Sequence, residues 1–240
     1  MSFQKHVKNG AIRSLPIIMG YIPVGLAFGV LAANVGFGSL ETTFMSLIVY
    51  AGSAQLISLD LVGNQAGLLA ITMTTFLVNL RHTLMSAALA PSVGHLSRWQ
   101  QAFFSFELTD ESFAVHSIDF KEEENPPAIR LFTTNTLAHL SWIGSSLLGF
   151  YTGAFFTNLE TWGIDYALPA MFIALLVIQL DNKKRYLIAL FSMLLSILLF
   201  VQEIGHWYII IATLAGATAG ASLDYYSKKK LKASDTENTF

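Results

Sequence analysis

Asn79-Leu80-Arg81-His82 places a guanidinium and an imidazole inside an apolar run, GLLAITMTTFLVNLRHTLMSAALA, which extends from Gly67 to Ala90. The run is long enough to cross a bilayer, because a membrane helix needs about 20 residues. An Arg at the centre of such a helix costs at least about 2.5–3.5 kcal/mol on insertion scales, so it normally faces a partner or a water-filled cavity. The rest of the chain must therefore supply a polar partner for Arg81 inside a helix bundle.

The composition is that of a polytopic membrane protein. Of the 240 residues, 53% are hydrophobic and 12% are charged, whereas soluble domains average about 25% charged residues. A soluble fold of this size could not cover its surface with so few charges. The sequence therefore predicts an all-α fold, a single transmembrane helix bundle over residues 1–240.

The hydrophobic pattern predicts about eight membrane segments. They cover residues 14–35, 41–62, 67–90, 99–118, 129–152, 166–180, 186–201 and 207–224. A helix that crosses the membrane perpendicularly needs about 20 residues. The last three segments are shorter than this, so some could be half-helices. No charge separates the second segment from the third, which leaves a re-entrant arrangement of these two open.

The positions of Lys and Arg predict the orientation of the chain. With eight spans and the N-terminus inside, 12 of the 14 Lys and Arg residues fall on the inner side. Of the other two, Arg98 falls on the outer side and Arg81 lies in the membrane. We therefore expect both termini in the cytoplasm, with residues 228–240 as a cytoplasmic tail.

A two-fold internal repeat, of residues 14–118 and 127–224, is a second possibility that the pattern leaves open. Each half has four candidate spans, and Ile57-Ser58-Leu59-Asp60 resembles Ile178-Gln179-Leu180-Asp181. The alternative is chance similarity between apolar helices.

The fourth segment is rich in aromatic residues, yet it carries Glu107, Asp110 and Glu111. Spacings of three and four place these acids on one helical face, which is stable in lipid only if it points into the bundle. We expect this face to meet Arg81 and His82 in a buried network that binds a charged substrate group or relays protons. Burial disfavours the charged form of an acid, as a proton-coupled carrier requires. The alternative is an ion pair that only fixes two helices together.

Two further stretches have unusual compositions. Ala51-Gly52-Ser53-Ala54-Gln55 is small and polar, which suits either tight packing or a local unwinding that exposes backbone dipoles to a ligand. In the first segment, Pro23 removes a backbone donor beside Gly25, which predicts a helix kink or break. Gly25 and Gly29 also form a pair of small residues that allows close helix packing.

Several chemistries lack their motifs. No H-E-x-x-H or P-loop pattern occurs, there is no cysteine, and the basic residues are too scattered to suggest nucleic-acid binding. His116, His139 and His206 show no ligand spacing, so we expect no metal and no cofactor. An intramembrane enzyme that uses Glu107 or Glu111 with a His and a non-transporting scaffold remain the alternatives to a transporter.

Four motifs over residues 14–115 resemble the AzlC family, the large subunits of bacterial branched-chain amino acid exporters. They are, in order, Pro16-x-x-x-Gly20-Tyr21-Ile22-Pro23-Val24-Gly25-Leu26-Ala27-Phe28-Gly29, Tyr50-Ala51-Gly52-Ser53-Ala54-Gln55, Asn79-Leu80-Arg81-His82 and Leu108-Thr109-Asp110-Glu111-Ser112-Phe113. The resemblance implies a multi-pass protein of the bacterial inner membrane that exports hydrophobic L-amino acids. It also implies the proton gradient as the energy source and a small multi-span partner of the AzlD type.

The motif residues form our candidate site, in which no residue is expected to be catalytic. The candidates for substrate binding are Gly52, Ser53, Gln55, Asn79, Arg81 and His82. The candidates for proton coupling or ion pairing are Glu107, Asp110 and Glu111. A zwitterionic substrate needs a cation or helix N-termini for its carboxylate and an acid or carbonyls for its ammonium. Arg81 and one of Asp110 or Glu111 would meet these needs.

Overall fold

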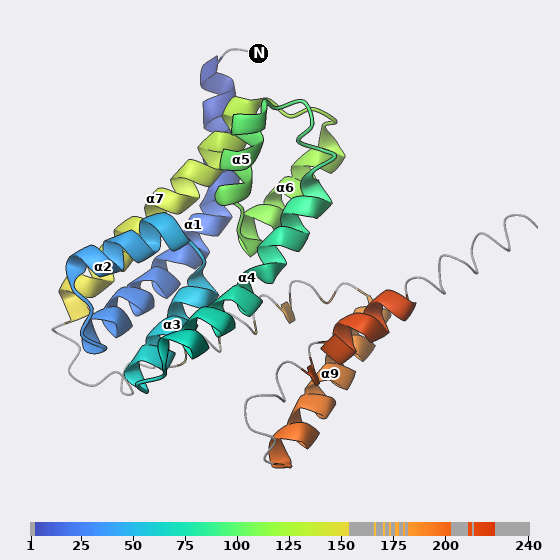
Figure 1. Cartoon of the computed structure of the whole chain (residues 1–240). Coiled ribbons are helices and arrows are strands. Elements are labelled where there is room, and N and C mark those ends of the chain that lie inside the picture. The colour runs from blue at the N-terminus through green and yellow to red at the C-terminus, as the bar shows by residue number, and fades with distance from the viewer. Residues whose placement is uncertain are drawn as a thin grey trace, which may run out of the picture. The chain divides into compact units, whose positions relative to one another are not determined.

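The computed structural model describes residues 3–153, 166, 170, 173, 176–177, 180, 182–202, 211–212 and 214–223. The chain divides into two compact units, Met1–Met171 and Phe172–Phe240. Every regular element among the described residues is a helix (Figure 1).

The helices of the first unit account for most of the described chain. They are α1 (Phe3–Asn34), α2 (Ser39–Phe44), the π-helix η1 (Met45–Val49), α3 (Gly52–Gly63), α4 (Leu68–Leu89), α5 (Arg98–Phe106), α6 (Asp110–Glu122) and α7 (Ala128–Gly153). In the second unit, α9 (Lys183–Val201) is the longest described helix. Among the described residues, α1, α4 and α9 are long and apolar enough to cross a membrane.

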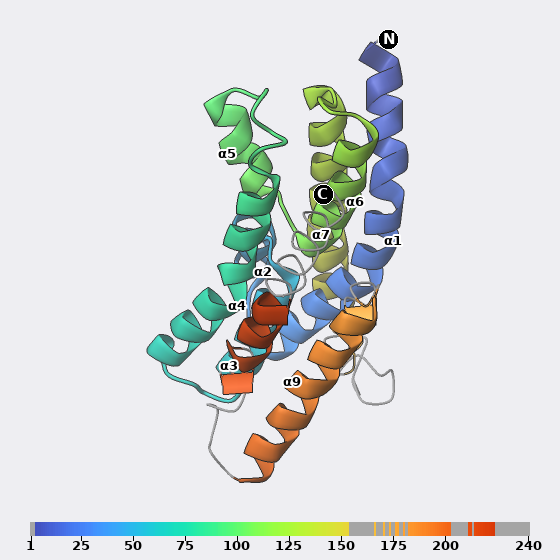
Figure 2. The ribbon, with the colours of Figure 1, turned by 90° about the vertical axis from the view of Figure 1, so that its right-hand side faces the viewer.

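Helices α1 and α7 lie side by side and form the main contact of the first unit (Figure 1, Figure 2). Glycines bring the two backbones together. A Cβ atom at Gly29 would collide with the carbonyl oxygen of Ser146, and one at Gly149 with that of Leu26. The close packing expected of Gly29 is therefore present, and no larger residue fits there without moving backbone.

Two apolar clusters fill the interior of this unit. The first joins α1 to α7 and the chain around α3 through Tyr21, Phe28, Tyr50, Leu59 and Trp142. The second lies around α5 and the start of α7 and is built from Leu89, Val93, Leu96, Phe104, Leu108 and Leu131. These clusters hold the polar residues of the site between packed helices.

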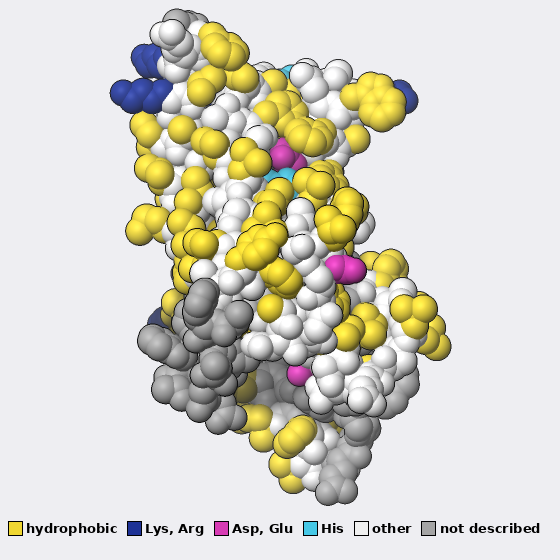
Figure 3. Space-filling model, turned by 90° about the vertical axis from the view of Figure 1, so that its left-hand side faces the viewer, with side chains coloured by type: hydrophobic (Ala, Val, Ile, Leu, Met, Phe, Trp, Pro, Cys, Tyr) yellow, Lys and Arg dark blue, Asp and Glu magenta, His cyan; other side chains and the backbone are white. Residues whose placement is uncertain are grey.

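The outside of the bundle is apolar, as a bilayer requires. Helix α4 exposes Leu69, Met73, Phe76 and Leu84. On the face shown in Figure 3, hydrophobic side chains are far more common than charged ones. Lipid tails are as apolar as these side chains, so no hydrophobic force opposes their exposure in a membrane.

Two of the predicted segments are not single helices. The second is interrupted at Tyr50 and Ala51, between η1 and α3. The fourth is interrupted at residues 107–109, between α5 and α6. The single acidic face predicted for Glu107, Asp110 and Glu111 is therefore wrong, because Glu107 is not in the helix that carries the other two.

The other segments agree with the prediction to different degrees. The first, third, fifth and seventh segments correspond to α1, α4, α7 and α9, and α1 continues through Pro16 and Pro23 without a break. Most of the predicted sixth segment and the whole of the 228–240 tail lie outside the described residues, as do Asp181 and His206. The eight spans, their orientation and the internal repeat stay predictions.

The contact between α1 and α7 predicts a sharp difference between two glycines of α1. Gly29→Ala should lower the midpoint of thermal unfolding in detergent, because overpacking a core typically costs about 1–3 kcal/mol. Gly20→Ala is the matched control, since nothing lies within 4 Å of a Cβ atom there. Equal stability of the two variants would contradict the backbone contact.

Candidate functional site

The first element of the site is the break before α3. Tyr50 has a left-handed backbone with φ of +42°, and Ala51 follows with φ of −137°. The helix restarts at Gly52, so the first N–H groups of α3 have no partner within their own helix. Such an end carries a partial positive charge. The unwound residues are thus Tyr50 and Ala51, while Gly52, Ser53 and Gln55 form the first turn of α3.

Gln55 and Trp142 fix this break in place. Oε1 of the fully buried Gln55 accepts hydrogen bonds from the backbone N–H of Ala51 at 3.2 Å and from Nε1 of Trp142 at 3.1 Å. A Cβ atom at Gly52 would lie 2.9 Å from the Trp142 ring. Gly52 is therefore needed for close packing, and the carbonyl of Gln55 is used by the protein itself.

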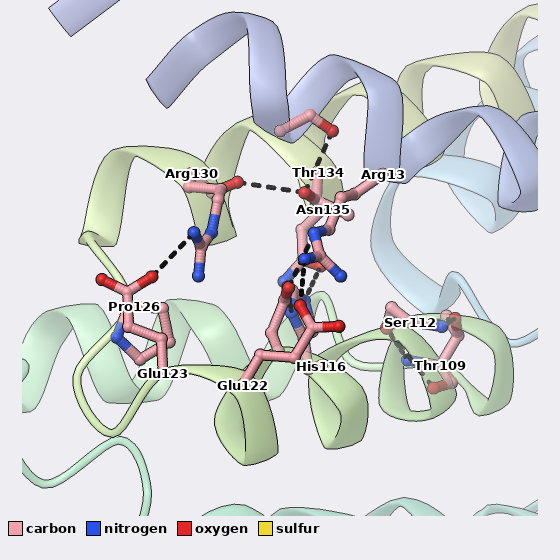
Figure 4. Close-up of polar contacts among 12 residues, drawn as sticks. Arg13, Thr109, Ser112, His116, Glu122, Glu123, Pro126, Arg130, Thr134 and Asn135 are labelled. Atoms are coloured by element: carbon pink, nitrogen blue, oxygen red, sulfur yellow. Dashed lines mark hydrogen bonds and ion pairs between the residues drawn. The ribbon is translucent and has the colours of Figure 1, made fainter. Parts of the chain in front are cut away.

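The second element is the break before α6, which Thr109 caps. Ser112 N–H donates to Thr109 Oγ1 at 3.3 Å, and Thr109 N–H donates to Ser112 Oγ at 2.9 Å (Figure 4). This reciprocal arrangement is a capping box. It starts a new helix at Asp110 and places Asp110 and Glu111 in the first turn, where negative charge is favoured by the helix dipole.

Arg81 of α4 joins the two helix starts. Its Nη1 lies 2.7 Å from Oδ2 of Asp110, and its Nη2 donates to Oγ of Ser53. Both charged side chains are half-buried. The structure thus places Arg81 against Asp110, the proposed partner, and adds Ser53, which composition alone did not connect to it.

Tyr21 brings α1 to the same place. Its hydroxyl oxygen lies 2.6 Å from Oγ1 of Thr109 and 3.0 Å from Oε2 of Glu111. Since hydroxyl groups both donate and accept, Tyr21 can donate to Glu111 while it accepts from Thr109. Glu111 therefore faces α1, while its neighbour Asp110 faces α4.

Glu107 has a different partner, which was not predicted above. It is 2% exposed, and its Oε1 lies 3.7 Å from Nδ1 of His139 on α7. Nε2 of His139 lies 3.0 Å from the carbonyl oxygen of Ser46 in η1, and the imidazole stacks on Tyr50 with ring centroids 3.8 Å apart. A signal was available, because Asn135, His139, Trp142 and Ser146 form a polar stripe at helical spacing in an apolar segment.

Asn79 and His82 are half-buried beside Arg81 on α4. The site also contains buried polar atoms that have no hydrogen-bond partner. They are Ser46 Oγ, Gln55 Nε2, Asn79 Oδ1, Arg81 Nε and Glu107 Oε2. Because most buried polar atoms in proteins are paired, this concentration is what a site for a polar ligand would offer.

Within the described part of the chain, no group of three or more His, Asp or Glu residues is arranged to hold a metal ion.

Known relatives of this chain are membrane proteins. The branched-chain amino acid transport protein AzlC of Bacillus subtilis is 24% identical over 202 residues, covering 84% of this chain and 79% of the relative. Inner membrane protein YgaZ of Escherichia coli is 28% identical over 225 residues, with 88% and 86% covered. An uncharacterized membrane protein of Archaeoglobus fulgidus is 33% identical over 182 residues, with 73% and 77% covered. No solved structure matches the chain.

The family model described as AzlC protein matches residues 16–156. This range is more than half of the 240 residues, and it contains both helix breaks, Arg81 and every acidic residue of the site. The four motifs and the geometry built on them therefore lie within the matched region. The chain belongs to the AzlC family.

Proposed function

We propose that this chain is a secondary transporter that exports branched-chain or other hydrophobic L-amino acids across the bacterial inner membrane. The observation that carries the proposal is Arg81, held in an apolar helix between the first turns of two interrupted helices, α3 and α6. Secondary transporters bind substrates at such discontinuous helices, whose positive ends face anionic groups. The names of the relatives from Bacillus subtilis and Escherichia coli support transport and an inner-membrane location.

The carboxylate of an amino acid would bind at Arg81 and at the start of α3. The guanidinium already holds an anion and a hydroxyl there, from Asp110 and Ser53. A substrate carboxylate can take either place, and because the amino acid is a zwitterion, the molecule as a whole adds no net charge to the membrane interior. The partial positive charge of the helix start adds to the attraction.

The ammonium group would bind to Glu111 or Asp110. Asp110 is the acid paired with Arg81 and Glu111 follows it in the chain, so both acids lie in the helix turn that meets the guanidinium. The rings of Tyr21, Tyr50 and Trp142 are packed together nearby, and they would contact the apolar side chain once the helices separate to admit it. The site thus has the three features that a hydrophobic amino acid requires.

Competition for these carboxylates would couple transport to protons. A proton on Glu111 or Asp110 removes the charge that holds the ammonium, so proton and substrate exclude each other from the site. Mutually exclusive binding moves the two in opposite directions. The proposal therefore is proton antiport, with Glu107 beside His139 as a further proton acceptor next to the site.

The remaining features of the proposal concern assembly and topology. They are a small AzlD-type partner subunit, about eight spans and cytoplasmic termini. The excess of Lys and Arg at the expected inner positions supports this orientation.

Arg81→Ala should abolish leucine efflux at physiological concentrations. Removing one partner of a buried charge pair costs about 2–5 kcal/mol, which corresponds to an affinity about 30-fold weaker or worse. Leucine efflux from loaded cells that express the chain with its small partner is the measurement. Arg98→Ala is the control, because Arg98 is exposed at the start of α5. Normal efflux by a folded Arg81→Ala variant would contradict the site and favour a purely structural ion pair.

Glu111→Gln should weaken leucine binding and remove part of its dependence on pH. In the wild type, lowering the pH should weaken binding, because the proton occupies the carboxylate that the ammonium needs. The glutamine cannot take up that proton, so its affinity should change less with pH. Leucine binding to the purified protein over a pH series tests this, with the exposed Glu124 as a Glu124→Gln control. A pH profile identical to that of the wild type would exclude Glu111 as the shared group.

A further inference from the structure

A second buried polar cluster lies at the end of the bundle that carries the N-terminal turns of α1. It contains Arg13 of α1, His116 and Asp119 of α6, and Asn135 of α7. Figure 4 shows Arg13, His116, Glu122 and Asn135 converging between these three helices. Asp119 is nine residues after Asp110 on the same helix, a rise of about 13 Å, so this cluster is separate from the Arg81 site.

The imidazole of His116 has an acceptor at each of its two nitrogens. Nε2 lies 2.6 Å from Oδ1 of Asn135, and Nδ1 lies 3.6 Å from Oδ2 of Asp119. His116, Asp119 and Asn135 are fully buried. A neutral imidazole has one N–H and an imidazolium has two. In the neutral ring with its N–H on Nε2, the lone pair of Nδ1 would face the carboxylate of Asp119 at 3.6 Å, whereas a protonated ring would form an ion pair with that carboxylate.

The charges around His116 also favour an added proton. Arg13 contacts Asp119 through Nε at 2.8 Å and Glu122 through Nη2, and Arg130 contacts Glu123 at 2.8 Å. These contacts combine two guanidinium groups with three carboxylates, which leaves one negative charge in excess. The other rings packed on His116, those of Phe104 and Phe120, carry no charge. A proton on His116 would make the cluster neutral.

Water can approach this cluster. A cavity of about 530 Å³ is lined by Asn9, Ile12, Arg13, Pro16, Val115, Ile118 and Arg130. It is far larger than the space that one water molecule needs, and it borders the guanidinium that holds Asp119. A proton therefore has a path from water to the cluster that does not pass through the Arg81 site.

We propose that His116, seated between Asn135 and Asp119, is a proton-binding site of this transporter. A hydronium ion that passes from the cavity beside Arg13 to His116 gives its proton to the lone pair of Nδ1, which leaves a water molecule and a cationic ring. The new N–H points to Oδ2 of Asp119, whose Oδ1 is held by Nε of Arg13, so two cations then share the negative charge of one carboxylate. Proton binding thus weakens the tie between α1 and α6, and proton release restores it. The link to transport rests on the proposed function, whereas the proton site itself does not.

The site is tested directly by nitrogen NMR of the full-length protein labelled at histidine. The signal of His116 is identified by its absence from the His116→Gln spectrum. The proposal expects this ring to gain and lose its second N–H reversibly as the pH is changed. In Asp119→Asn, the ring should hold the second proton less well than in the wild type. A His116 ring that stays neutral at every pH at which the protein is folded would overturn the proposal.

The role in coupling is tested with the chain and its small partner reconstituted in lipid vesicles. Leucine exchange without a pH gradient reports the substrate site, and leucine-driven proton movement, followed with a pH-sensitive dye, reports coupling. His116→Gln should keep exchange but lower proton movement about tenfold or more, the size of a typical coupling between two sites. The control is His95→Gln, because His95 is exposed and also lies between two carbonyl oxygens.

The outcomes separate the two proposals. Proton movement by His116→Gln at the wild-type level would overturn the coupling role. An equal loss of exchange and proton movement would also overturn it, in favour of a structural role.

If His116→Gln does not fold, Asn135→Asp provides the second variant. Its carboxylate should hold the proton on His116 more tightly and slow proton movement more than exchange. A wild-type protein without leucine exchange would refute the proposed function, and the NMR result would still decide the proton site.

Discussion

The cost of placing a guanidinium in an apolar helix is the constraint on which the rest of this structure depends. Arg81 cannot be left unpaired inside a membrane bundle, because a charge there lacks the solvation of water. Asp110 and Ser53 meet that need, and each is supplied by the first turn of an interrupted helix. The breaks themselves are held by groups far away in the sequence. Trp142 fixes the first break through Gln55, and Tyr21 contacts the cap of the second at Thr109.

The two clusters differ in how their charges are paired. At Arg81, the guanidinium is paired with Asp110, and Glu111 contacts the hydroxyl group of Tyr21. A zwitterionic ligand can bind there without changing the net charge. At His116, three carboxylates face two guanidinium groups, and a proton on the ring would balance them. Helix α6 carries residues of both clusters, which would let a change at one affect the other.

The sequence predicted the parts of the fold and site that depend on local composition. The apolar spans and the need of Arg81 for an acid follow from transfer free energies, which are properties of single segments. The spacing of Thr109 and Ser112 also signals a helix start, but the apolar pattern on both sides outweighed it, so the break at Glu107 was missed. The left-handed Tyr50 could not be predicted, because it depends on Gln55 and Trp142, which lie 87 residues apart. His116 and His139 were set aside because they show no metal-ligand spacing, and their contacts with Asn135 and Glu107 join parts of the chain that are far apart in sequence.

The glycine contact between α1 and α7 has a mechanical consequence. Two backbones in contact at Gly29 and Gly149 cannot slide past each other without driving a carbonyl oxygen into the opposite chain. The two helices therefore behave as one rigid unit. Tyr21 of α1 and His139 of α7 keep a fixed separation. Arg81 is on α4, which is not part of this rigid unit. Any rearrangement that opens the site must then move α4 and its neighbours relative to the rigid pair of α1 and α7.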